Sequence, residues 1–372
     1  MTYLSFDRAS DAVVASQVMP YVERLARRGV DVSLHSFETE EPPPILRARM
    51  ENAGVRWVPH RLGWAAAAGG LARVARAALI TRGAPLVHAR SHLAGAAAVV
   101  GRPQHWVWDV RSLWTEQRIE QRMLRRGSPV ESTLRFFERR AAGASDAIVT
   151  LASAAVPVLE SRTGCAVGPK TRVISTCVDL DHFAVAPAPT GDGVVRLLLS
   201  GSLNALYDVP AMIAFAARFS ALAPAALEWA GGPESPWSRD LAAAGVVPAP
   251  CPFGDMPSRI AESHAGMCLL RLDLTSSAAA TPTKVAEFLA CGRPVVVSAG
   301  LGDLPAILAD GKCGVVVDDT SSVGLDRAAA ELAALLDDPG LGARCRAAAE
   351  EHFDVERGVD TLLETYRAIT AG

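Results

Sequence analysis

The sequence has 372 residues, half of them apolar, and a formal net charge of −3 at pH 7. This length predicts two domains of ordinary size, and the near-neutral charge argues against a nucleic-acid partner. The seven cysteines follow no metal-ligand spacing, and the sequence shows neither a signal-peptide pattern nor a membrane-length apolar run, so we expect a cytoplasmic protein with reduced thiols.

The N-terminal half alternates short apolar strands with helical patterns, which predicts a parallel sheet covered on both faces. We expect an amphipathic helix at Ser16–Arg28, a last strand of this half at Val173–Val178, and a proline- and glycine-rich linker at Ala186–Gly193. The other expected strands are Thr2–Phe6, Val30–Phe37, Val55–His60, Leu86–Arg90, Trp106–Val110 and Ala147–Leu151.

A helix that leads into a strand dominates the second half, over Thr281–Asp303. We expect Thr281 to cap this helix, Gly292 to follow its end, and Val295–Val297 to form a buried strand. The other elements expected here are strands at Val194–Leu199, Leu227–Ala230, Gly266–Leu270 and Gly314–Asp318, and a last helix at Val355–Ala371. The pattern predicts an α/β fold with one domain over residues 1–187, a second over 188–354, and a C-terminal helix over 355–372.

Ligands of open parallel sheets bind beyond the carboxyl ends of the strands, which selects a candidate nucleotide site in the second half. Free amides at the start of the helix, with Lys284 on its first turn, suit phosphate, and the Glu287 carboxylate suits a pair of ribose hydroxyls. The residues expected to approach the ligand with them are Gly201, Ser202, Gly231, Gly232 and Thr283. The alternative is that the glycines form only tight turns and that Lys284 and Glu287 form an exposed ion pair within the helix.

The first half places charged residues and histidines at two expected strand ends. Arg90 and Arg111 could neutralise a departing diphosphate, because fixed cations aimed at developing charge contribute strongly to catalysis. Asp109 and His92 are further catalytic candidates. Two alternatives stay open: Asp109 and Arg111 form only a structural ion pair, and the histidines at these ends, His88 above all, are satisfied core residues.

The run T-P-T-K-V-A-E-F-L-A-C-G-R-P-V at 281–295 resembles the nucleotide-sugar site of retaining glycosyltransferases of family 4. The run D-V-R-S-L-W-T-E at 109–116 resembles a second motif of some members. The resemblance implies the GT-B fold, with two facing Rossmann-like domains, parallel sheets and a C-terminal helix that packs back on the first domain. It also implies transfer of a sugar from a nucleotide diphosphate sugar, of UDP or GDP type, to an acceptor hydroxyl with retention, and without a metal or a further cofactor.

Two departures from the family pattern limit what the resemblance implies. Ala279 stands where many relatives have a glutamate that contacts the donor sugar, so the identity of that sugar does not follow. Many relatives also bring an arginine and a lysine to the diphosphate from just after the first strand of the second domain. This sequence has Asn204, Tyr207 and Asp208 there, which would leave Lys284 as the main cation of that domain.

Seven arginines lie between Arg118 and Arg140, with Phe136 and Phe137 among them. This segment could attract an anionic acceptor or an anionic membrane surface, which would place the protein peripherally at the inner face of a membrane. The alternative is a solvated pair of helices with intrahelical ion pairs. The acceptor itself stays open between a small molecule, a polysaccharide and a lipid-linked sugar, and the abundance of alanine and arginine indicates a GC-rich bacterial genome.

Two other functions fit the same fold: a sugar-nucleotide 2-epimerase, and a non-catalytic pseudo-glycosyltransferase subunit. The epimerase would need acid–base carboxylates at the site, whereas the non-catalytic subunit is suggested by the missing glutamate at Ala279. Other enzyme classes fit poorly, because the sequence has no G-x-S-x-G elbow, no Walker lysine loop and no H-E-x-x-H pair, and its first strand lacks G-x-G-x-x-G.

Overall fold

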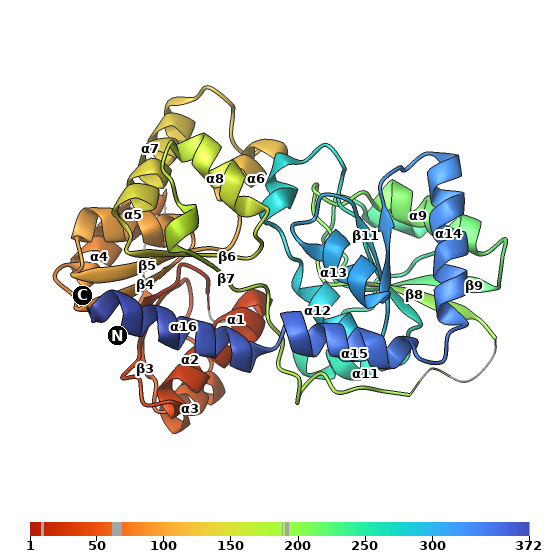
Figure 1. Ribbon diagram of the computed structural model, residues 1–372, viewed down its shortest axis with the longest axis horizontal. Helices are drawn as coiled ribbons and strands as arrows, with labels where there is room; N and C mark the ends of the chain where they lie inside the picture. The colour runs from red at the N-terminus through yellow and green to blue at the C-terminus, as the bar shows by residue number, and fades with distance from the viewer. Residues whose placement is uncertain (9–10, 62–68, 188, 190–192, 372) are drawn as a thin grey trace. The chain divides into compact units, whose positions relative to one another are not determined.

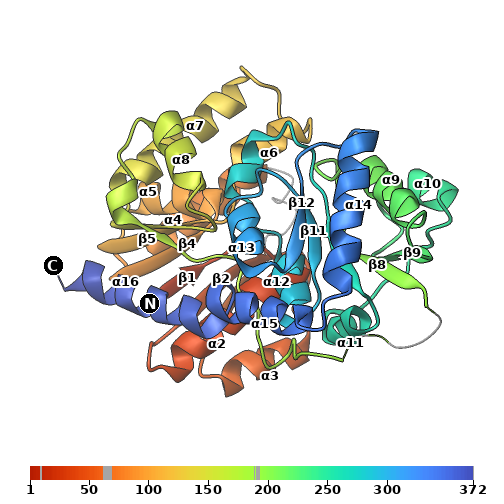
Figure 2. The same cartoon turned by 45° about the vertical axis from the view of Figure 1, so that its right-hand side comes forward.

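The computed structural model describes residues 1–371 except 9–10, 62–68, 188 and 190–192. The chain forms two compact units, Met1–Ser175 with Val355–Gly372, and Thr176–Asp354. Each unit has a parallel sheet with helices on both of its faces, as Figures 1 and 2 show. The α/β class and the two Rossmann-like units predicted from the sequence are therefore confirmed.

The first unit has a seven-stranded sheet in the order β3-β2-β1-β4-β5-β6-β7, and all of its pairings are parallel. The order reverses between β1 and β4, and this switch point is where open sheets of this kind bind ligands. The strands are β1 (Thr2–Leu4), β2 (Ser33–Glu38), β3 (Arg56–Arg61), β4 (Leu86–Arg90), β5 (His105–Val110), β6 (Ala147–Thr150) and β7 (Thr171–Val173).

The helices of the first unit cover both faces of its sheet (Figure 1). One group comprises α4 (Gly69–Thr81), α5 (His92–Gly101), α6 (Trp114–Glu120), α7 (Pro129–Ala144) and α8 (Ala155–Thr163). The other comprises α1 (Ala12–Gln17), α2 (Met19–Arg27), α3 (Pro44–Asn52) and the C-terminal α16 (Val355–Thr370).

Helix α16 packs on α2 and β5 of the first unit. Its apolar stripe is buried, including Val359 and Leu362. The Arg24 guanidinium also pairs with the Glu356 carboxylate at 2.6 Å. A buried apolar stripe, with an ion pair beside it, accounts for the attachment of this helix to a unit that lies far away in the sequence.

Two predicted elements of the first unit differ from those observed. The helix expected at Ser16–Arg28 is broken at Val18, because Pro20 lacks an amide to continue the hydrogen-bonding pattern and instead starts α2. The strand expected at Val173–Val178 was wrong, since β7 ends at Val173. The partner strand β6 has only four residues and ends at Thr150, which pairs with Val173. Residues after Val173 therefore have no further strand residue of β6 to pair with.

The second unit has a five-stranded parallel sheet in the order β12-β11-β10-β8-β9, with its switch point between β8 and β10. Its strands are β8 (Val195–Ser200), β9 (Ala225–Ala230), β10 (Ala265–Cys268), β11 (Val295–Ser298) and β12 (Gly314–Val317). Its helices are α9 (Val209–Phe219), α10 (Ser238–Ala243), α11 (Met256–Ala261), α12 (Thr283–Ala290), α13 (Leu304–Gly311), α14 (Ser322–Leu336) and α15 (Leu341–His352).

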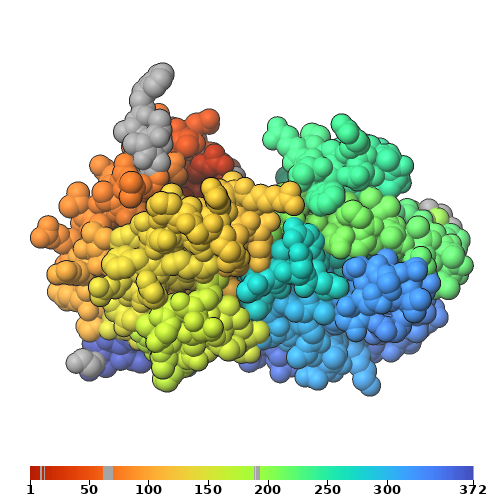
Figure 3. Space-filling view, turned by 90° about the horizontal axis from the view of Figure 1, so that it is seen from above, coloured from red at the N-terminus to blue at the C-terminus, as the bar shows by residue number. Residues whose placement is uncertain are grey.

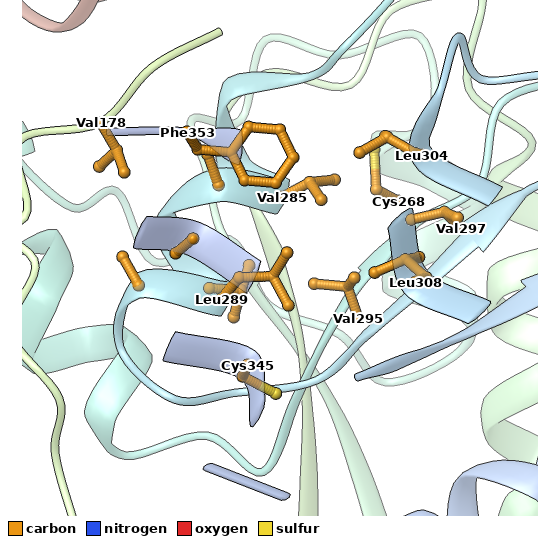
Figure 4. Close-up of a cluster of buried hydrophobic side chains, with 14 of the residues drawn as sticks. Val178, Cys268, Val285, Leu289, Val295, Val297, Leu304, Leu308, Cys345 and Phe353 are labelled. Carbon is orange, nitrogen blue, oxygen red and sulfur yellow. The ribbon is translucent and has the colours of Figure 1, made fainter. Parts of the chain in front are cut away.

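Two apolar clusters hold the helices of the second unit to the two faces of its sheet. One joins α9 and α14 to the sheet, and the other joins α12, α13 and α15, on the opposite face in Figure 2. Figure 4 shows the second cluster, where Val285 and Leu289 of α12 pack toward Val295 of β11 and Phe353. This packing fixes where α12 begins relative to the sheet.

The segment that leads into the second unit packs within it. Val178 and Phe183 are buried in the cluster of Figure 4, and the amide of Val178 donates to the carbonyl of Phe353 at 2.7 Å. The Arg293 guanidinium donates to the carbonyl of Ala186, and that of Arg346 to the carbonyl of Phe183. The compact units therefore divide at residue 175 rather than at 187, and residues 188 and 190–192 of the expected linker lie outside the described residues.

Candidate functional site

The start of α12 offers backbone amides at the carboxyl side of the second sheet. The helix begins at Thr283 with Pro282 as its N-cap, one residue later than predicted, and Pro282 has no side-chain acceptor for the helix amides. Thr281 is therefore not the cap; its carbonyl accepts a hydrogen bond from the Thr176 hydroxyl. Amides at a helix start without a side-chain cap suit an anion.

Lys284 lies against an aromatic ring. Its Nζ is 4.5 Å from the ring centroid of Tyr207, a residue that follows β8. Burial lowers the pKa of Lys284, but its interactions with Tyr207, Cys268 and Glu287 outweigh that effect and raise it, so the side chain stays charged at neutral pH. The structure thus brings the segment after β8 to the first turn of α12. The sequence analysis noted Tyr207 only because it stands where many relatives have an arginine or a lysine, and did not predict it as a residue of this site.

Glu287 is buried, with 8 % of its surface exposed. Burial raises the pKa of this carboxyl to about 7, although the charge of Lys284 works to lower it. Its carboxylate accepts no hydrogen bond, and it forms no ion pair with Lys284, in the part of the chain that the structure describes. The alternative of an exposed intrahelical ion pair is therefore wrong, and the buried carboxylate is disposed to accept hydrogen bonds from a ligand.

The structure explains why glycine is needed at some of the predicted positions and not at others. Gly201 directly follows β8 with a φ of 72°, a conformation that glycine adopts without strain. A Cβ on Gly231 would lie 2.1 Å from the indole Nε1 of Trp229, which donates to the Gly201 carbonyl, so Gly231 is required by this packing. Gly232 has open space, and Ser202 is exposed. The tight-turn alternative thus accounts for Gly201, and packing against Trp229 accounts for Gly231, whereas Ser202 and Gly232 remain accessible to a ligand.

Asp109 lies at the centre of a buried charged cluster in the first unit. Its carboxylate is 3.4 Å from Arg111 Nη1, 3.2 Å from His88 Nε2 and 3.6 Å from Arg90 Nη1. Burial works to raise the pKa of Asp109, but Arg111, His88 and Arg90 together lower it well below its usual value. The cluster sits at the carboxyl ends of β4 and β5, next to the switch point, and it keeps Asp109 ionised.

The two candidate arginines differ in accessibility. The Arg90 guanidinium is buried between Asp7 and Asp109, and its Nη1 forms no hydrogen bond among the described residues. The Arg111 side chain is half-buried and also donates to the Gln17 side chain at 3.2 Å. The ion pair of Asp109 and Arg111 exists, so Arg111 is both a structural partner and the more accessible cation of the cluster.

Both histidines at these strand ends are buried and bonded. His88 contacts Asp109 through Nε2 and Tyr366 through Nδ1, which agrees with a satisfied core residue. His92 Nε2 lies 3.2 Å from the Leu134 carbonyl and 3.3 Å from the Thr115 hydroxyl, and burial lowers the pKa of His92. A neutral His92 therefore connects α5 with α6 and α7, and nothing in these contacts assigns it to the chemistry.

The arginine-rich segment combines ion pairs with exposed residues. Glu116 is a shared acceptor for Arg126 and Arg135, and Arg135 pairs within α7 with Glu131, so ion pairs account for part of this charge. Burial raises the pKa of Glu116, but its arginine partners lower it overall. The exposed basic and apolar residues of this segment include Arg122, Met123, Arg125, Val130, Phe136, Arg139 and Arg140. Figure 3 shows this part of the chain, coloured yellow, at the surface of the first unit.

No group of three or more His, Cys, Asp or Glu residues that could hold a metal ion occurs in the described ranges. None of the helices, as far as the structure describes them, is both long and apolar enough to cross a membrane.

Two family models match the sequence. Residues 14–182 match Glycosyltransferase Family 4, and residues 270–352, which include α12, match Glycosyl transferases group 1. A search of curated proteins finds no significant match.

Solved structures with a similar fold span the whole chain at low sequence identity. HepE from Anabaena, in complex with UDP and glucose, is 14 % identical with a TM-score of 0.70 over 99 % of each chain. Sucrose-phosphate synthase from Thermosynechococcus elongatus is 17 % identical with a TM-score of 0.70, over 100 % of this chain and 98 % of that one. WaaG, a glycosyltransferase involved in lipopolysaccharide biosynthesis, is 15 % identical with a TM-score of 0.65 over 100 % of both chains. These likenesses show the GT-B fold.

Proposed function

Since the chain is a glycosyltransferase of the family 4 type with the GT-B fold, we propose that it transfers a hexosyl group from a nucleotide diphosphate sugar to an acceptor hydroxyl with retention. A UDP sugar is the first candidate donor, because HepE is described in complex with UDP and glucose; a GDP sugar is the second. The acceptor is a small molecule, a polysaccharide or a lipid-linked sugar.

The observation that carries the proposal is that one short helix, α12, holds both Lys284 and the buried Glu287 carboxylate. The Lys284 ammonium and the first amides of α12 would stabilise the leaving diphosphate, whose charge grows as the glycosyl bond breaks. The Glu287 carboxylate, which lacks a hydrogen bond in the described chain, would accept hydrogen bonds from the two ribose hydroxyls. With these groups in place, neither a metal ion nor a further cofactor is needed in the proposed reaction.

The first unit would supply the acceptor side, as the resemblance implies. Arg111 is the more accessible cation of the Asp109 cluster and would bind an anionic group of either substrate, while Asp109, itself paired with Arg90, holds Arg111 in place. His92 is the weakest of the proposed catalytic residues, because its ring is engaged with Leu134 and Thr115.

Thermal unfolding in the presence of UDP, GDP and their sugars tests the donor site. A ligand that binds only the folded protein raises its melting temperature. We expect one diphosphate nucleotide to stabilise the wild type and to have little effect on Lys284→Met or Glu287→Gln. The exposed Glu331 on α14 offers a control, since Glu331→Ala should respond as the wild type does. No shift of the wild type by any nucleotide would contradict the proposal.

The rival functions predict other products. A 2-epimerase would convert the donor into its epimer without consuming an acceptor, and a non-catalytic subunit would bind the nucleotide sugar without any turnover. Transfer of labelled sugar to an acceptor would exclude both, and the comparisons favour neither of them.

The surface around α7 supports a second proposal, peripheral contact with an anionic membrane at the cytoplasmic face. The exposed apolar side chains Met123 and Val130 lie among arginines there, and a basic surface with apolar side chains binds anionic lipid. Co-sedimentation with vesicles that contain phosphatidylglycerol should therefore be lost in Arg122→Glu/Arg125→Glu. Equal sedimentation of both proteins would count against this contact.

A further inference from the structure

We infer that Tyr366, on the C-terminal helix α16, is a positioning residue for Arg111 and acts through His88 and Asp109. The inference rests on the proposed function, since a cation at the carboxyl ends of β4 and β5 matters only if an anionic group binds there. Tyr366 is one of the buried residues of this helix.

The first contact joins the C-terminal helix to the centre of the sheet. The Tyr366 hydroxyl lies 2.8 Å from His88 Nδ1, and both side chains are buried. Burial raises the pKa of Tyr366 well above its usual value, so the hydroxyl keeps its proton. The ionised Asp109 carboxylate can only accept from His88 Nε2, which leaves Nδ1 of the neutral ring to accept a hydrogen bond from this hydroxyl. Tyr3 stacks on the His88 ring at 4.4 Å between centroids with an interplanar angle of 11°, which holds the plane of the imidazole.

The second contact follows from the tautomer that this bond selects. An imidazole that accepts at Nδ1 carries its proton at Nε2. His88 Nε2 lies 3.2 Å from Asp109 Oδ2 and donates to it. If the proton moved to Nδ1, the Nε2 lone pair would face the buried carboxylate and repel it, so the tautomer and the position of Asp109 depend on each other.

The third contact joins Asp109 to Arg111, which is the most accessible residue of the series. Asp109 Oδ1 accepts from Arg111 Nη1 at 3.4 Å, while Gln17 accepts from Arg111 Nη2 at 3.2 Å. The side chain of Arg111 keeps 13 % of its surface exposed, against 3 % for that of Asp109. Arg111 is thus the member of this series that a ligand could touch, and the residues behind it determine where its guanidinium lies.

The hydroxyl of Tyr366 is not needed to attach α16. The helix is held by its apolar stripe and by the pairing of Arg24 and Arg28 with Glu356. Removing one hydroxyl should therefore leave the helix in place and change only the hydrogen bond to His88.

The test compares Tyr366→Phe with Thr365→Val, a matched control one residue earlier on the same helix. Each variant loses one buried hydroxyl hydrogen bond, but among the described residues the Thr365 hydroxyl bonds only within α16, to the Thr361 carbonyl at 2.7 Å. We expect kcat to fall about tenfold in Tyr366→Phe, on the scale of one hydrogen bond, and to stay within about twofold in Thr365→Val. The Kd of the nucleotide should change far less than kcat in both variants, because Lys284, Glu287 and the amides proposed to hold it lie on α12.

Nitrogen-15 NMR of protein with labelled histidine gives a readout that needs no substrate. His88→Gln assigns the His88 signals, and the wild type should show the tautomer protonated at Nε2. In Tyr366→Phe the Nδ1 resonance should shift and the protonated Nε2 signal should weaken, whereas Thr365→Val should match the wild type.

Each result decides one hypothesis. A changed His88 signal with a lower kcat in Tyr366→Phe alone supports the positioning role. An unchanged His88 signal, or an equal loss of kcat in both variants, overturns it. A wild type that binds no nucleotide sugar would instead contradict the proposed function, and the NMR spectra would still show whether Tyr366 sets the His88 tautomer.

Discussion

The two units hold their candidate site residues in opposite ways. In the second unit, Lys284 rests on the face of the Tyr207 ring, and the Glu287 carboxylate accepts no hydrogen bond within the described residues. In the first unit, Asp109 is surrounded by Arg90, Arg111 and His88. A charged group without strong partners can give its interactions to a ligand, whereas a group inside a closed network mainly orients its neighbours.

The largest expected effect is the loss of stability in Asp109→Ala. Removing this carboxylate leaves Arg90 and His88 buried without their common partner, and breaking a buried charged contact of this kind costs about 3–5 kcal/mol in the free energy of unfolding. Urea denaturation measures the change. Glu287→Ala, the same kind of substitution in the second unit, should destabilise by much less, and equal losses would break the comparison.

The pH dependence of nucleotide binding should be the next largest effect. The pKa of Glu287 is about 7, and the hydroxyls of a ribose donate to the ionised form, so affinity should rise about tenfold from pH 6 to pH 8. Isothermal titration calorimetry on the wild type and Glu287→Gln measures it. The nucleotide phosphate titrates equally in both proteins, so its effect cancels in the ratio of the two affinities. A ratio independent of pH would contradict the proposed binding of ribose by the ionised Glu287.

The Glu287 carboxyl should also make the free energy of unfolding depend on pH. Its pKa is raised from 4.5 in the unfolded chain to about 7 in the folded protein, so between these values the folded state holds a proton that the unfolded state has released. The free energy of unfolding should therefore fall as the pH rises through this window. Glu287→Gln should remove that fall and be more stable than the wild type at pH 8, while binding nucleotide less tightly.

The smallest effect is expected at Tyr207. A cation–π contact of a partly exposed cation contributes about 0.5–1 kcal/mol, so Tyr207→Leu should weaken nucleotide affinity about twofold to fivefold by releasing Lys284 from its position. Tyr207→Phe keeps the ring and should bind almost as the wild type does. If the two variants bind equally well, the ring does not orient Lys284. The protein would then hold Lys284 even more loosely than the contrast with the Asp109 cluster implies.

Much of the fold could be predicted because its signals are local. The strand at Leu86–Arg90 was confirmed to the residue, and the helix and strand around Lys284 differ from expectation by two residues at most. Apolar runs and helical spacing repeat within each element, so they can be read without knowledge of the partner. The order of helix and strand then placed Arg90, Arg111 and Lys284 at the carboxyl sides of parallel sheets.

The sequence by itself determined the α/β class, the two parallel sheets and the positions of the charged residues along the chain. Only the tertiary structure decided what surrounds them: the burial of Glu287, the indole of Trp229 against Gly231, and the bond between Tyr366 and His88 across 278 residues. Burial and long-range hydrogen bonds depend on which elements pack together, and no local spacing encodes that choice. The same charged residue therefore becomes a ligand for substrate or a support for its neighbours according to its contacts.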